Sequence, residues 1–135
     1  MQQVLLRDLM LPHARFGPQQ IETVVKSFYA KVRTDADLAP IFAVHVTDWP
    51  AHEAKIARFW RNAILRDPVY SGNPMQKHRA AGNVAPEHFA RWLQLFDEAL
   101  AECLPPDLAG DWSVLAHRIG HSLKLGLEMS RVPRL

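Results

Sequence analysis

The sequence predicts an all-α protein. Prolines and glycines divide the 135 residues into segments of helical length, and apolar residues recur within these segments every three or four positions. No segment shows the sustained two-residue alternation that is typical of a half-buried strand. The length fits one domain with a buried core, so we expect a single domain over residues 1–135.

The first two predicted helices have clear boundaries. One begins after Gly17-Pro18 and ends before Ala39-Pro40, because the residue that precedes a proline avoids the helical region. Its apolar face holds Ile21, Val24, Val25, Phe28, Tyr29 and Val32. The next helix begins at Asp48-Trp49-Pro50, with Asp48 as the N-cap and Pro50 in the first turn, and runs to about residue 65.

Three further helices complete a predicted set of about five. A two-turn helix follows Asn73-Pro74 and ends at Gly82. Another begins at Pro86 and is ended by the prolines at 105 and 106. The last covers about residues 107–129, and short turns connect all of them.

Composition excludes several classes of protein. The net charge is +2, from 16 basic and 14 acidic residues that are scattered along the chain, so we expect no nucleic-acid partner. The single cysteine, Cys103, allows no intrachain disulfide. Arg7 and Asp8 interrupt the N-terminal apolar stretch, and no apolar run could span a membrane. We therefore expect a cytoplasmic protein with no membrane partner.

Three polar or aromatic side chains lie on apolar helix faces. His52 begins the stripe that continues through Ile56, Phe59, Trp60 and Ala63. Tyr29 and Trp92 lie on similar stripes, and each can donate a hydrogen bond. For each residue alone, a position in the core or at its rim is the favoured explanation.

His78 lies on the two-turn helix, which is too short to be stable by itself. Either a metal bond from His78 or packing of Met75 and Tyr70 would hold this helix down. The positions of the remaining histidines indicate no binding or metal-ligating role. His88 is expected to be a solvated helix-terminus residue, the H-x-x-x-H pair His117 and His121 lacks a third ligand, and His13 and His45 fall in predicted loops.

Four stretches together give a family resemblance. They are FYAKVRTDADLAPIF (28–42), DWPAHEAKIARFW (48–60), YSGNPMQKH (70–78) and HFARWLQLF (88–96). In this order and spacing they resemble the truncated haemoglobins, and among these group III, over about residues 19–127. The resemblance implies a shortened globin fold in which two helix pairs cross as a two-over-two sandwich. Residues 1–18 would be an N-terminal extension, either a capping helix or a tail.

The resemblance also implies a haem site. His78 matches the proximal histidine that binds the iron, and Tyr29, His52 and Trp92 match distal pocket residues. Phe42 matches the phenylalanine that packs on the haem, Phe28 and Ile56 match apolar pocket positions, and Tyr70 is expected to support the turn before His78. No catalytic residue is assigned.

The implied cofactor is haem b, because the chain has no C-x-x-C-H attachment motif. We expect a five-coordinate iron that binds O2, NO and CO, and cations for the haem propionates from among Lys55, Arg58, Lys77 and Arg79. With a reductase partner, peroxidase-like or NO-dioxygenase-like activity would fit this pocket. A haem-based ligand store or sensor without turnover is one alternative, and a helical interaction module without a cofactor is another.

Overall fold

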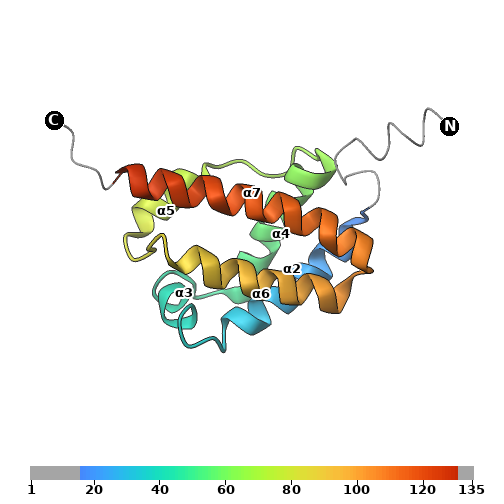
Figure 1. Ribbon diagram of the computed structural model, residues 1–135, viewed down its shortest axis with the longest axis horizontal. Helices are drawn as coiled ribbons and strands as arrows, with labels where there is room; N and C mark the ends of the chain where they lie inside the picture. Colours follow the sequence, from blue (N-terminus) through green and yellow to red (C-terminus); the bar gives the residue numbers. More distant parts are fainter. Residues whose placement is uncertain (1–15, 131–135) are drawn as a thin grey trace.

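The computed structural model describes residues 16–130, which form six helices and no strand, so the all-α prediction is confirmed. The helices are α2 (Pro18–Val32), α3 (Ala39–His45), α4 (Trp49–Leu65), α5 (Pro74–Ala81), α6 (His88–Cys103) and α7 (Pro106–Ser130). Helix α2 packs on α4 and α6, and α6 packs on α7, so the pairs α2/α4 and α6/α7 form two layers (Figure 1). None of these helices is both long enough and apolar enough to cross a membrane.

Side-chain caps fix where the helices around the cavity begin. The Asp48 carboxylate accepts a hydrogen bond from the backbone N–H of Ala51 at 3.1 Å, as predicted. Asn73 caps α5 in the same way, with its side-chain oxygen 3.1 Å from the backbone nitrogen of Gln76. Each cap satisfies a backbone donor that the first turn of a helix leaves free.

Helix α3 corrects the prediction for residues 39–45. Helix α2 ends at Val32, and Ala39-Pro40 begins a new helix instead of ending the previous one. The Asp35 carboxylate accepts the backbone N–H groups of Asp37 and Leu38 at 3.1 and 3.0 Å, which prepares the turn into α3. Pro40 then lies in the first turn, where its missing N–H costs no hydrogen bond.

The core between the two layers is a cluster of aromatic rings centred on Phe96, which is completely buried. Trp60 and Trp92 stack on this ring, with centroids 5.3 and 5.4 Å away. Phe28 and Trp112 meet it edge-on at 5.1 and 5.6 Å. This cluster joins α2, α4, α6 and α7, so it holds together the four long helices that surround the cavity.

The two-turn helix α5 is held against the C-terminal part of α7. Met75 packs directly on Gly126, so closely that a Cβ atom at position 126 would overlap the Met75 side chain. Packing by Met75 is therefore one of the attachments that this short helix needs. It fixes the position of His78, which lies one turn further along α5.

Candidate functional site

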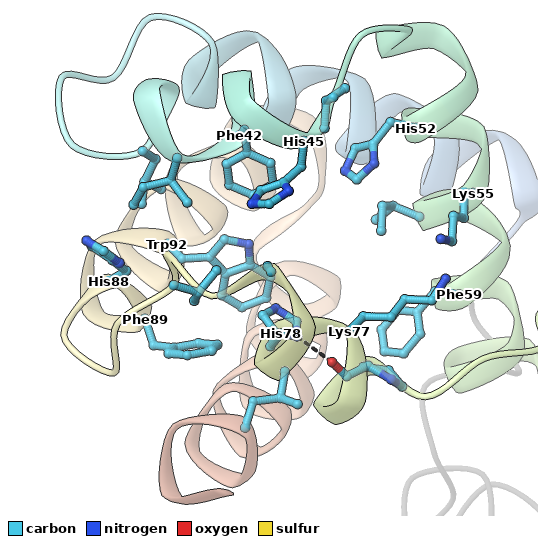
Figure 2. A pocket seen from close by; sticks show the side chains of 18 of the residues that line it. Phe42, His45, His52, Lys55, Phe59, Lys77, His78, His88, Phe89 and Trp92 are labelled. Atoms are coloured by element: carbon cyan, nitrogen blue, oxygen red, sulfur yellow. Dashed lines mark hydrogen bonds between the residues drawn. The ribbon is translucent and has the colours of Figure 1, made fainter. Parts of the chain in front are cut away.

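A cavity of about 520 Å³ lies between α3, α4, α5 and α6, with part of α7 as its floor. This volume falls in the range of sites for small molecules and cofactors. Seven of the eight residues predicted for the site line it. They are Tyr29, Phe42, His52, Ile56, Tyr70, His78 and Trp92. Figure 2 labels Phe42, His52, His78 and Trp92 among them. The structure thus brings together residues from five separate helices, α2 to α6, and one loop.

Phe28 is the predicted site residue that does not line the cavity. Its side chain is 1% exposed and lies behind two residues that do, with its ring centroid 4.9 Å from Tyr29 and 5.6 Å from Trp92. The periodicity placed Phe28 and Tyr29 on one helix face, but consecutive residues differ by about 100° in direction. Phe28 supports the wall of the cavity from within the core.

His78 enters the cavity from α5 with one ring nitrogen already engaged. Its Nδ1 donates a hydrogen bond to the backbone carbonyl of Pro74 at 2.6 Å, drawn as a dashed line in Figure 2. Because a carbonyl only accepts, the proton is on Nδ1, and the neutral ring keeps a lone pair on Nε2. The ring also packs beside Phe89, with centroids 5.7 Å apart. Nε2 is therefore the atom of His78 that is available to a metal.

Tyr29 and His52 form a neutral hydrogen-bonded pair across the cavity from His78. The Tyr29 hydroxyl and the His52 Nε2 are 3.2 Å apart. Burial raises the pKa of the Tyr29 hydroxyl far above its usual value, and the nearby Glu53 raises it further. Burial also lowers the pKa of His52, with the positive charges of Lys55 and Lys77 acting in the same direction. At neutral pH the pair therefore carries no charge.

Trp92 contributes a further hydrogen-bond donor to the same cavity. Its ring lies against Phe96 and Phe28, and its edge reaches the cavity (Figure 2). Among the described residues no group accepts a hydrogen bond from its indole N–H, which can only donate. The donor is thus available to a molecule in the cavity.

Two lysines mark one edge of the cavity. Lys55 of α4 and Lys77 of α5 both line it, and their ammonium groups lie close enough that Lys77 lowers the pKa of Lys55 (Figure 2). Within residues 16–130, neither lysine has a carboxylate partner. A close like-charge pair without a counter-ion is the expected environment for an anion.

Two histidines that the sequence placed outside the site also line the cavity. His45 is the last residue of α3, not part of a loop, and His88 begins α6 with its Nδ1 accepting the backbone N–H of Ala85 at 2.9 Å. His88 lies four residues before Trp92, so helical spacing puts both on one face, and that signal was present in the sequence. His45 was missed because α3 was missed.

His117 and His121 lie away from the cavity. His117 bonds through Nε2 to the Asp97 carboxylate at 2.7 Å, and the same carboxylate accepts the Ser113 hydroxyl at 2.6 Å. His121 is exposed, and residues 16–130 hold no group of three or more side chains arranged for a metal ion. His13 lies outside the described residues.

Comparisons with known proteins agree with this fold. A family model described as bacterial-like globin matches residues 15–115. The group 3 truncated hemoglobin ctb of Campylobacter jejuni is 41% identical over 61% of this chain and 68% of its own length. The group 1 truncated hemoglobin GlbN of a Nostoc species is 33% identical over 63% of this chain and 70% of its own.

A solved structure extends the comparison to three dimensions. The crystal structure of group III truncated hemoglobin from Campylobacter jejuni matches with a TM-score of 0.77 and 32% identity, covering 81% of this chain and 89% of that one. The chain therefore belongs to the bacterial-like globin family and, within it, to the group III truncated haemoglobins. Membership gives it a haem-based function with small gaseous ligands such as dioxygen.

Proposed function

We propose that this chain binds haem b without a covalent link and that His78 is the ligand of the iron. The observation that carries the proposal is the state of the His78 ring, whose Nδ1 donates to Pro74 and leaves the Nε2 lone pair free at the cavity. A neutral histidine nitrogen is the proximal iron ligand of globins and peroxidases. The bond to Pro74 also holds the ring in one orientation.

The rest of the cavity fits the two chemical parts of haem. Its walls are mostly apolar and aromatic, as at Phe42, Phe59 and Phe89, which suits a flat hydrophobic macrocycle. The ammonium groups of Lys55 and Lys77 would hold the two propionate carboxylates at the edge of the cavity. This arrangement would offset the repulsion that now lowers the pKa of Lys55.

When bound, haem supplies an iron centre that takes up small gaseous ligands such as O2, NO and CO. His52 and His78 approach the cavity from opposite sides, so the distal donors are those near His52 (Figure 2). Tyr29 can donate its O–H and Trp92 its N–H to a ligand there. A hydrogen bond to a charged group contributes about 1.5–3 kcal/mol, which corresponds to roughly tenfold or more in ligand release for each donor.

Slow release suits chemistry on dioxygen, nitric oxide or peroxide better than it suits transport. The hydrogen bond between Tyr29 and the Nε2 of His52 occupies the atom through which His52 would bind iron. We therefore propose that the resting iron is five-coordinate, open to ligands, and reduced by a separate reductase. Nitric oxide consumption with a reductase, and dye oxidation with peroxide, would show turnover. Ligand binding without either would indicate a store or sensor.

The iron ligand is tested by His78→Gly, with His88→Ala as the matched control on the same cavity. The reduced wild type with carbon monoxide should show a sharp, shifted Soret band, and so should the His88 variant. His78→Gly should lose the histidine–iron spectrum and regain it when free imidazole is added. A His78 variant that keeps the wild-type spectrum without imidazole would exclude His78 as the ligand.

A further inference from the structure

Helix α3 forms one wall of the cavity but is lightly attached to the rest of the protein. Ile41, Phe42 and His45 all line the cavity, yet none of the seven residues of α3 is fully buried. The extensive helix-to-helix packing among the described residues joins the other five helices and does not involve α3. A wall that buries so little surface needs specific bonds to stay in place.

Asn83, just after the end of α5, supplies two such bonds. Its Nδ2 donates to the backbone carbonyl of Ile41 at 3.2 Å, and its Oδ1 accepts a hydrogen bond from the Nε2 of His45 at 2.8 Å. Because a backbone carbonyl only accepts, the amide nitrogen must face Ile41 and the amide oxygen must face His45. Ile41 and His45 are four residues apart and share one helix face, so a single amide group holds both.

Gly82 determines the position of Asn83. It ends α5 with a φ of 78°, in the left-handed region where glycine is favoured, and so turns the chain from α5 toward α3. Asn83 follows five residues after His78, on the segment that leaves the same helix. The two hydrogen bonds therefore connect the proximal side of the cavity with the wall that carries Phe42.

We propose that His45 and Asn83 form a latch that keeps α3 closed over the cavity and sets how fast the cofactor leaves. The proposal rests on the proposed binding of haem in this cavity. His45 and Asn83 act through α3, so they are positioning residues. With the latch broken, α3 opens more often, and Ile41 and Phe42 move away from the cavity with it.

The test measures transfer of haem from the loaded protein to an excess of an apo-globin acceptor. We compare the wild type, His45→Ala, Asn83→Ala and the double variant. A neutral hydrogen bond is worth about 0.5–1.5 kcal/mol, so each single variant should release haem about two- to tenfold faster, with Asn83→Ala the faster of the two. Because the two residues share one bond, the double variant should match Asn83→Ala and not multiply the two effects.

Val44→Ala is the matched control, since Val44 lies beside His45 on α3 and is 70% exposed. It should release haem at the wild-type rate. The urea midpoints of the cofactor-free variants should fall by no more than the loss of these hydrogen bonds explains, which separates a latch from a general loss of stability. Unchanged release rates, or independent effects that multiply, would overturn the latch. A wild type without a Soret band would instead refute haem binding, before any variant is compared.

Discussion

The aromatic core and the cavity wall at α3 differ in what holds them together. In the core, Phe96 is completely buried and has rings of four neighbours around it. On α3 no residue is fully buried, and the partial packing of Ile41 and Phe42 is supplemented by hydrogen bonds from Asp35 and Asn83. Non-directional packing thus builds the scaffold, and a few directional bonds fix the wall.

This difference separates stability from binding. Burial of large aromatic side chains contributes most of the favourable free energy of folding, and it changes little when the wall moves. The wall can be adjusted through single polar residues without changing the core. We expect substitutions in the core to change the free energy of unfolding, and substitutions near α3 to change opening and release.

The largest effect should come from Phe96→Ala. Truncation of a buried phenylalanine leaves a cavity and costs about 3–5 kcal/mol of unfolding free energy. Phe59→Ala is the control, because Phe59 is a partly buried ring on the cavity wall. It should lose clearly less stability but bind haem more weakly. Urea unfolding of both cofactor-free variants measures the first effect, and equal losses would contradict the separation of core from wall.

A smaller and more local effect is expected from Asp35→Ala. The substitution removes the carboxylate that accepts the N–H groups of Asp37 and Leu38 and that pairs with Arg91. Loss of a side-chain cap costs about 1 kcal/mol. Backbone hydrogen exchange should therefore rise at the start of α3 and stay unchanged around Phe96. Asp37→Ala is the control, because its exposed side chain caps nothing in the described structure; if it speeds exchange equally, the cap is not the cause.

The smallest effect is a change of stability with pH that is due to His52. Burial lowers the pKa of His52 below its ordinary value of 6.5, so the unfolded chain takes up this proton first as the pH falls. The contribution of His52 to stability is thus fully present above pH 6.5 and declines as the pH falls below it. The unfolding free energy of the cofactor-free protein, measured between about pH 7.5 and 5, should therefore fall mainly below pH 6.5. His52→Gln should flatten the curve, and a curve of unchanged slope would contradict the assignment.

The sequence predicted the long helices well because their signals are local. Apolar residues at helical spacing and caps such as Asp48 depend only on neighbours in the chain. Helix α3 was missed because Ala39-Pro40 can either end a helix or begin one. In the folded chain the Asp35 carboxylate accepts two backbone N–H groups before Ala39 and so favours the start of a helix there. A pattern of apolar residues does not reveal these two hydrogen bonds.

Prediction of the cavity was limited in another way. The family resemblance supplied His78, Tyr29, His52 and Trp92 as candidates, and the structure brings all four to one cavity. The resemblance did not show that Phe28 lies in the core while its neighbour Tyr29 lines the cavity. Contacts between distant segments, such as His45 with Asn83, 38 residues apart, depend on the packed fold and have no signal in a single sequence.

The clustering of aromatic rings around Phe96 has an optical consequence. The chain has four tryptophans, and each lies beside another ring of the core or cavity, with centroid distances of 5.3 to 5.9 Å. A pigment held in the cavity would lie close to all of them and would quench their ultraviolet emission by energy transfer. The loaded protein should therefore be nearly dark and the emptied protein bright. Its own fluorescence would then record each departure of the cofactor without an added dye.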